Sequence, residues 1–410
     1  MFLEIENIGK IQKASVEIRG ITVIAGNNNT GKSTYGKILY CMFNAFYNAE
    51  STIQKERKDS LKYIIRSFQG ISHVKSLRYI VDNITEHQLS FEEISSLLKE
   101  LIDNKNIITN NINIDNDIDS MAERIIRSRD VTDKQIQKII LTRFLRSEFR
   151  DRIIHVNHAE EKGAISLKIK GNTLSASIEN NECTGFSDEV KIICDALYID
   201  TPFIMDEMDS STFFRGNGHR ARLIRSLSRS PDDIGAIDEI LTKQQMQRIL
   251  SNIRTVVNGE FKQNEDEWVF QEEGLEKPLG MFNISTGMKP FMIIKRLLEA
   301  GEIKDQGVLI LDEPEIHLHP DWQLKYAELL VLLQKEFNLN ILLTTHSPYF
   351  LNAIEVYSKI NNISTRCNYY LTDVQGDVCS IREVTNNLDL VYRKLAIPFQ
   401  ELENLRYREN

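Results

Sequence analysis

The sequence is poor in cysteine and proline, and it lacks a long hydrophobic run. Its 410 residues include 5 cysteines and 8 prolines. The cysteines form no C-x-x-C pair, which excludes a zinc ribbon or a disulfide scaffold and indicates reduced thiols. No stretch approaches the roughly 18 apolar residues that a membrane-spanning helix needs. The first ten residues also lack the pattern of a signal peptide, so we expect a cytoplasmic protein with no membrane partner.

The composition is that of a folded chain with a substantial core. Apolar residues make up 41% of the sequence and charged residues 27%, which excludes a fibrous or wholly disordered protein. The net charge of −9 argues against a protein that coats nucleic acid non-specifically, although a local basic groove is compatible with it. The length favours two or three domain-sized units, or one large domain with insertions.

A glycine loop follows a short β-rich run near the N-terminus. Residues 21–25 are strand-like, residues 26–33 fit G-x-x-x-x-G-K-S, and an apolar-periodic helix pattern follows. In this order the three segments form a cradle for phosphates at the positive end of the helix. Lys32 would reach the β- and γ-phosphates, and Ser33 would offer its hydroxyl to Mg²⁺. The phosphate-binding residues expected here are Gly26, Asn27, Asn28, Asn29, Thr30, Gly31, Lys32, Ser33 and Thr34.

A second candidate site lies at the end of another apolar run. Residues 308–311 read as a parallel strand buried on both faces, and Asp312 follows at its carboxyl end, where open α/β sheets bind ligands. We expect Asp312 to hold Mg²⁺ through water and Glu313 to polarise a water for attack on the γ-phosphate. A solvated helix start is the plainer interpretation of two such acids, and the loop at residues 26–33 argues against it.

Two further polar turns border apolar segments. His346 follows the buried run 341–345, where it would contact the γ-phosphate and the attacking water, or serve only as a capping or core residue. Ser285 precedes an apolar-periodic helix and is a good N-cap. Either it caps that helix and no more, or the turn Ser285, Thr286 and Gly287 binds the γ-phosphate of a nucleotide held by a second subunit.

Together these motifs resemble those of the ATP-binding-cassette ATPase superfamily, and more narrowly of its SMC/RecF/OLD branch. Residues 26–33 match the Walker A loop, 309–313 the Walker B motif, 285–289 the signature motif and His346 the switch histidine. The run 312–320 followed by 344–348 is typical of OLD-like ATPases. The signature departs from the transporter form LSGGQ at Thr286 and Lys289, which favours the OLD-like branch.

The resemblance implies an α/β P-loop NTPase fold, namely an ABC-type head with a mixed sheet, an antiparallel β subdomain and a helical insertion. We expect the head at residues 1–50 and 151–410, and the insertion or arm at 51–150. Residues 164–178 read as a β-hairpin. No counterpart of the superfamily's glutamine loop is evident, and residues 200–203 are our candidate for that region.

The resemblance also implies how the site works. ATP and Mg²⁺ would be the cofactors, with Ser33 and Asp312 holding the metal and Glu313 and His346 acting catalytically. Two chains would form a homodimer or a higher homo-oligomer that encloses each ATP between the loop of one chain and the 285–287 turn of the other.

Basic and histidine residues outside these motifs suggest partners rather than chemistry. We interpret His317 and His319 as a dimer contact and His155 and His158 as surface residues, although both spacings could suggest a metal. The arginine-rich stretch 211–230 contains no aspartate or glutamate. It is either a solvated surface or a docking surface for nucleic acid, DNA included, or for an acidic partner. Its arginines are Arg215, Arg220, Arg222, Arg225 and Arg229.

Short OLD-like ATPases look similar to the ATPase subunits of bacterial antiphage systems, such as Septu-type, PARIS-type and abortive-infection modules. The resemblance implies an ATP-dependent switch that controls a separately encoded effector, a nuclease or a toxin. We expect no nuclease activity in this chain, because the segment after His346 is too short for a Toprim domain. A DNA-repair or chromosome-maintenance ATPase is the main alternative, and a transporter subunit or an ATP-bound scaffold are others.

Overall fold

The structure is a computed structural model in which the chain divides into two compact units. The larger unit comprises residues 1–47 and 141–410, and the smaller one residues 48–140. The residues that the structure describes are 1–67, 74–87, 89–103, 114–155, 157, 162–208, 216–230, 246–264, 267–376 and 378–408.

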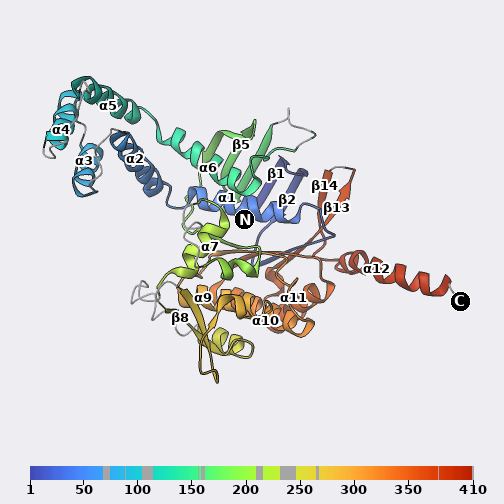
Figure 1. Ribbon diagram of the computed structural model, residues 1–410. Helices are drawn as coiled ribbons and strands as arrows, with labels where there is room; N and C mark the ends of the chain where they lie inside the picture. The colour runs from blue at the N-terminus through green and yellow to red at the C-terminus, as the bar shows by residue number, and fades with distance from the viewer. Residues whose placement is uncertain are drawn as a thin grey trace. The chain divides into compact units, whose positions relative to one another are not determined.

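The larger unit is built on one sheet of eleven strands, in the order β6-β5-β4-β1-β2-β14-β13-β3-β12-β11-β7. Figure 1 shows β5, β1, β2, β14 and β13 of this sheet. The strands β13, β3, β12, β11 and β7 are parallel to one another. The strands β6, β5, β4, β1 and β2 form an antiparallel part, and β14 joins the two parts. The predicted α/β class with a mixed sheet and an antiparallel part is therefore confirmed.

The bounds of the strands follow the sequence pattern closely, and the expected hairpin at residues 164–178 is confirmed as β4 and β5. In the sheet the strands are β1 (Phe2–Ile8), β2 (Ile11–Glu17), β3 (Ile21–Ala25), β4 (Gly163–Ile169), β5 (Asn172–Glu179), β6 (Glu182–Asp188), β7 (Ala196–Ile199), β11 (Val308–Asp312), β12 (Asn340–Thr345), β13 (Cys367–Gln375) and β14 (Val378–Glu383).

Helices cover both faces of the parallel part, which explains why β3, β7, β11 and β12 are mostly apolar without alternation. On one face α1 (Lys32–Phe46) approaches so closely that a Cβ on Gly36 would lie 2.9 Å from Ile310 Cγ2. The main hydrophobic core joins the other face to α9 (Lys289–Glu299), α10 (Pro320–Phe337) and α11 (Pro348–Ile360). Both faces of the strands that lead into the candidate site are therefore fixed by packing.

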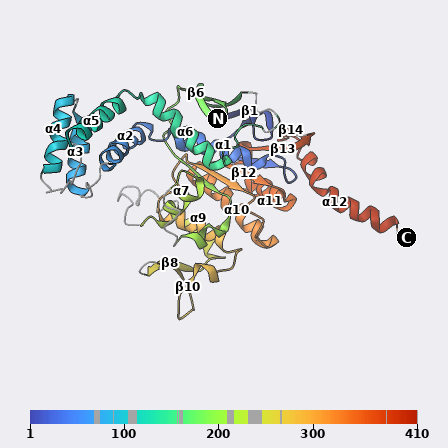
Figure 2. The same ribbon diagram turned by 45° about the horizontal axis from the view of Figure 1, so that its top comes forward.

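The remaining elements of the larger unit surround this core. The last helix, α12 (Asp389–Arg408), extends away from the sheet of the larger unit in both views (Figure 2). The others are η2 (Pro202–Glu207), α7 (His219–Ser228), the three-stranded sheet of β8 (Gly259–Asn264), β9 (Glu267–Glu272) and β10 (Leu279–Gly280), η5 (Met281–Asn283) and η6 (Ser364–Arg366).

The smaller unit is helical and has a hydrophobic core of its own, which includes Leu61, Ile80, Leu98 and Ile125. Ser90 and Glu93 form a capping box before α4, in which each side chain accepts the backbone N–H of the other residue. Its helices are α2 (Ala49–Arg66), α3 (Val74–Glu86), α4 (Phe91–Asp103) and α5 (Ile114–Arg129), followed by the first part of α6 (Asp133–Phe149). None of the described helices in either unit is long and apolar enough to cross a membrane.

The prediction that Ser285 caps the next helix is wrong. The helix α9 begins at Lys289 with Met288 at its N-cap, and the Ser285 carbonyl instead accepts the Met288 N–H at 3.0 Å in a preceding turn. Pro290 explains the difference, because proline is favoured in the first turn of a helix, where its missing N–H is not needed.

Candidate functional site

The glycine loop has the shape that phosphate binding requires. Gly31 is the N-cap of α1 with φ 78°, a left-handed conformation that glycine adopts without strain. A Cβ on Gly26 would lie 2.1 Å from Thr372 Oγ1, so only glycine fits there. Thr372 also hydrogen-bonds Thr30 across 2.7 Å. Thr372 on β13 therefore packs against the glycine loop, and the sequence did not predict this contact.

Lys32 is buried beside the loop, and its ammonium group forms two hydrogen bonds and an ion pair. Its Nζ donates to the carbonyls of Gly26 at 3.1 Å and Asn27 at 2.8 Å, and it forms an ion pair with Glu313 Oε1 at 3.1 Å. The side chain is only 4% exposed. The loop at residues 26–33 and the acid that follows β11, which are far apart in the sequence, thus meet at one ammonium group.

Asp312 and Glu313 are ordered by Thr344 on the neighbouring strand β12. The Thr344 hydroxyl donates to Asp312 Oδ1 at 2.5 Å and accepts the Glu313 N–H at 3.0 Å. Glu313 has φ 47°, a conformation that is costly for a residue with a side chain and that is often found at functional sites. From this position the Glu313 side chain reaches Lys32.

His346 lies beside both Glu313 and Glu315. His346 Nδ1 lies 3.6 Å from Glu313 Oε2 and 3.9 Å from Glu315 Oε1. The contact with His346, together with that of Lys32, outweighs partial burial and lowers the pKa of Glu313 to about 2. Glu313 in turn raises the pKa of His346. Burial raises the pKa of Glu315, which is 2% exposed.

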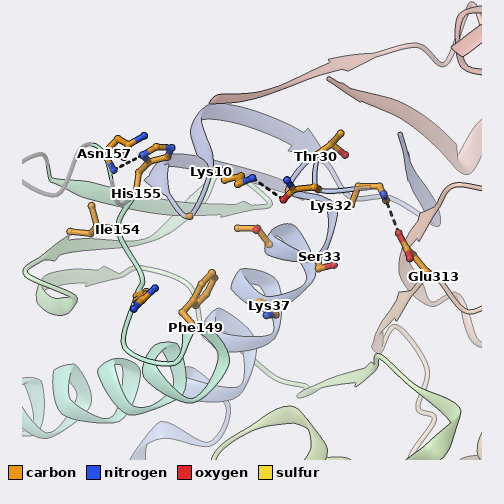
Figure 3. A pocket seen from close by; sticks show the side chains of 15 residues that line it. Lys10, Thr30, Lys32, Ser33, Lys37, Phe149, Ile154, His155, Asn157 and Glu313 are labelled. Carbon is orange, nitrogen blue, oxygen red and sulfur yellow. Dashed lines mark hydrogen bonds and ion pairs between the residues drawn. The ribbon is translucent and has the colours of Figure 1, made fainter. Parts of the chain in front are cut away.

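A cavity of about 490 Å³ opens beside the loop (Figure 3). Lys32 and Glu313 point toward each other at one end of it, and Phe149, Ile154 and His155 lie at the other end. It is lined by Gly9, Lys10, Asn29, Thr30, Gly31, Lys32, Ser33, Thr34, Lys37, Phe149, Arg152, Ile154, His155, Asn157 and Glu313. His155 is 5% exposed, not a surface residue, and its expected companion His158 lies outside the described residues.

The turn Ser285–Gly287 is not among the described residues that line this cavity. A Cβ on Gly287 would lie 3.1 Å from the Trp322 ring and 3.3 Å from the His317 carbonyl oxygen. Trp322 belongs to the first turn of α10, so this helix holds the turn close. The structure therefore brings residues 26–33, 312–313 and 346 together within one chain, and it places 285–287 elsewhere.

Most of the described arginines of the 211–230 stretch form ion pairs within the chain. Arg220 pairs with Asp200 at 3.0 Å, and Arg229 pairs with Glu302 at 3.0 Å. Arg222 pairs with Asp195 and Glu302, and Arg225 donates to a backbone carbonyl. Arg215 lies outside the described residues. These contacts give the arginines a structural role, and a docking role for them stays a prediction.

Across the described ranges, no group of three or more His, Cys, Asp or Glu side chains is placed to hold a metal ion. His317 instead packs edge-to-face against Phe203, with ring centroids 5.1 Å apart. The candidate glutamine-loop region, residues 200–203, leads into η2, and its assignment stays a prediction.

Comparison with known proteins identifies the family of this chain. Residues 1–351 match the family model described as AAA ATPase domain. The chain belongs to the AAA ATPase domain family. It is also similar, with 24% identity over 388 residues, to a retron Vc95 probable ATPase of Vibrio cholerae serotype O1 biovar El Tor. The match covers 88% of this chain and 72% of that protein. The narrower assignment to the OLD-like branch stays a prediction.

Two solved structures of SMC heads resemble this AAA family member only weakly. One is the SMC head domain from Thermotoga maritima, with 10% identity and a TM-score of 0.41, covering 93% of this chain and 98% of that one. The other is an SmcHead bound to the C-winged helix domain of ScpA, with 11% identity and a TM-score of 0.43, covering 95% and 98%. At these low TM-scores the likeness supports no statement about function or assembly.

Proposed function

We propose that this protein binds and hydrolyses ATP and uses the cycle as a molecular switch. The observation that carries the proposal is Glu313, held between Lys32 and His346 beside a glycine loop. An acid that can polarise a water and a lysine for phosphate are groups that in-line attack on a γ-phosphate uses, and His346 lies 3.6 Å from that acid. They come from three separate segments of the chain, so a chance arrangement is a poor explanation.

The residues at the loop fit a magnesium ion. Mg²⁺ prefers oxygen ligands and keeps several waters, and Ser33 and Asp312 offer a hydroxyl and a carboxylate. No described residue hydrogen-bonds Ser33 Oγ, and each oxygen of Asp312 accepts one hydrogen bond, which leaves further lone pairs. Ser33 and Asp312 would therefore hold the ion, which when bound neutralises charge on the β- and γ-phosphates.

Lys32 and Glu313 would change partners when ATP binds. A triphosphate competes with Glu313 for the Lys32 ammonium, because both are anions that need the same donor. Losing this cation would raise the pKa of Glu313 from about 2 and make it a better base for the attacking water. His346 would hold the other carboxylate oxygen during this exchange. The ion pair with Lys32 thus adds to the contact with His346 in keeping the pKa of Glu313 low until nucleotide is present.

Two copies of the chain would complete the site. The 285–287 turn does not line its own chain's cavity, and Ser285 is exposed. In the proposed dimer each turn faces the triphosphate held by the other copy, so that ATP binding joins the copies and hydrolysis releases them. The fit of Gly287 against Trp322 keeps the turn in one shape for that contact.

The likeness to a retron ATPase supports a role in antiviral defence. A switch of this kind would control a separately encoded effector, a nuclease or a toxin, and would have no nuclease activity itself. Co-purification of tagged protein with the products of adjacent reading frames tests this role. ATP-dependent binding to DNA ends without any such partner would favour a repair ATPase instead.

Replacing the proposed water-polarising acid tests the chemistry. Glu313→Gln should lower the hydrolysis rate about 100-fold or more, because an amide cannot accept the proton, while ATP still binds. The variant should accumulate as an ATP-bound dimer in size-exclusion chromatography with light scattering. Glu401→Gln, at an exposed position on α12, is the matched control. Wild-type turnover by Glu313→Gln would show that this acid is not the base.

A further inference from the structure

Each oxygen of the Asp312 carboxylate accepts a hydrogen bond from a hydroxyl group. Thr344 on β12 donates to Oδ1 at 2.5 Å, and Tyr198 on β7 donates to Oδ2 at 3.2 Å. Both strands run parallel to β11 on either side of it. Two donors on opposite oxygens fix the rotation of the carboxylate plane, which one donor alone would leave free.

Tyr198 is itself held tightly. Its side chain is in a position only 1% exposed, and on one side the helix α1 contacts it, since a Cβ on Gly36 would lie 3.5 Å from Tyr198 Cζ. On the other side the ring of His219 lies 4.4 Å from the tyrosine ring, centroid to centroid, at an angle of 31°. The tyrosine is therefore packed against both the helix that follows the glycine loop and the first residue of α7.

His219 is fixed in turn by two acids. Its Nδ1 lies 2.7 Å from Glu148 Oε2 and its Nε2 lies 3.1 Å from Asp200 Oδ2, and its backbone N–H donates to Glu148 Oε1 at 2.8 Å. The rings of His219 and Tyr198 are close enough for a favourable aromatic contact. Glu148 thus restrains His219, His219 restrains the Tyr198 ring, and Tyr198 restrains Asp312.

We propose that Tyr198 is a positioning residue for the magnesium site, acting through Asp312. This inference rests on the proposed function. A carboxylate that binds a metal through water must present its free lone pairs in one direction, and donors that hold such a ligand commonly control metal affinity. Tyr198 does this without touching the nucleotide cavity, since it is not among the described residues that line it.

Tyr198→Phe tests the role, because it keeps the ring and removes only the hydroxyl. We expect the Mg²⁺ concentration for half-maximal ATP hydrolysis to rise about tenfold, with hydrolysis largely restored at saturating Mg²⁺. Binding of a fluorescent ATP analogue in EDTA should equal that of wild type. Thermal unfolding verifies that the variant folds.

Tyr35→Phe is the matched control, because Tyr35 is a buried tyrosine on α1 whose hydroxyl has no hydrogen-bond partner among the described residues. It should leave the Mg²⁺ requirement unchanged. His219→Gln keeps the Tyr198 hydroxyl but loosens its ring, so it should shift the requirement in the same direction by less.

The outcomes separate the two proposals. An unchanged Mg²⁺ requirement in Tyr198→Phe, or an equal shift in the Tyr35 control, overturns the positioning role while ATP hydrolysis by the wild type stands. Weaker binding in EDTA would also overturn it, because the tyrosine would then act on the nucleotide and not on the metal. A wild-type protein that neither binds nor hydrolyses ATP at any Mg²⁺ concentration would end both.

Discussion

His219 should make the stability of the larger unit depend on pH in a direction that the structure fixes. Burial by itself lowers the pKa of His219, but the contacts with Asp200 and Glu148 outweigh it and raise the pKa from 6.5 to about 9. A group whose pKa is higher in the folded state stabilises that state fully below its unfolded pKa. This stabilisation is lost as the pH rises from about 6.5 through about 9.

The size of the effect follows from the two pKa values. They differ by about 2.5, and each pKa unit corresponds to about 1.4 kcal/mol, so His219 contributes about 3 kcal/mol at pH 6 and little at pH 10. Its side chain is 11% exposed, so solvent screens these contacts only slightly. The groups that face it are Glu148 on α6, Asp200 after β7 and the rings of Tyr40 and Tyr198.

The measurement compares wild type with His219→Gln from pH 6 to pH 10. Both tryptophans of the chain, Trp268 and Trp322, lie in the larger unit, so their fluorescence in urea follows the unfolding of that unit. The free energy of unfolding should favour the wild type at pH 6, and this advantage should shrink by about 3 kcal/mol toward pH 10. Lysines, cysteines and other tyrosines titrate in both proteins and cancel. An advantage that stays constant over this range would refute the assignment of a charged His219.

Two further substitutions test the loop and the turn. Lys32→Ala should weaken the binding of a fluorescent ATP analogue about 30-fold or more, which corresponds to the loss of about 2 kcal/mol of charge-assisted hydrogen bonding; unchanged affinity would remove the phosphate-binding role of the lysine. Gly287→Ala should displace the Trp322 ring, cost about 1 kcal/mol of stability and weaken the ATP-dependent dimer in light scattering. Gly185→Ala, where a Cβ would meet nothing within 4 Å, is its control, and equal behaviour of the two variants would show that the turn needs no glycine.

The sequence predicted well whatever depends on neighbouring residues. The glycine loop is contiguous, so its strand, turn and helix follow from residues 21–46 alone. Asp312 and Glu313 were recognisable because they directly follow an apolar run, and the end of a buried parallel strand is a place for ligands. Local patterns of this kind carry their own geometry and need no knowledge of the rest of the chain.

Predictions from local sequence patterns were incomplete where other residues of the chain also decided the outcome. Ser285 has the side chain of an N-cap, yet Pro290 sets the start of α9 four residues later. The arginines after residue 211 read as a basic surface because the acids that pair with them, such as Asp195 and Glu302, lie outside that stretch. The composition of a short stretch does not reveal ion-pair partners that come from elsewhere in the chain.

Only the tertiary structure placed Tyr198, Thr344 and Thr372 at the site. Tyr198 carries the one polar side-chain atom of an otherwise apolar run. A buried hydroxyl needs a hydrogen-bond partner, and this was the one signal in the sequence that could have pointed to a role for Tyr198. Its partner, Asp312, is 114 residues away. The sequence by itself indicated which residues we expect to bind phosphate and metal, because that chemistry resides in side chains and in short loops. The order of strands in the sheet decided which of them meet, because strand order depends on the packing of the whole core and on no single segment.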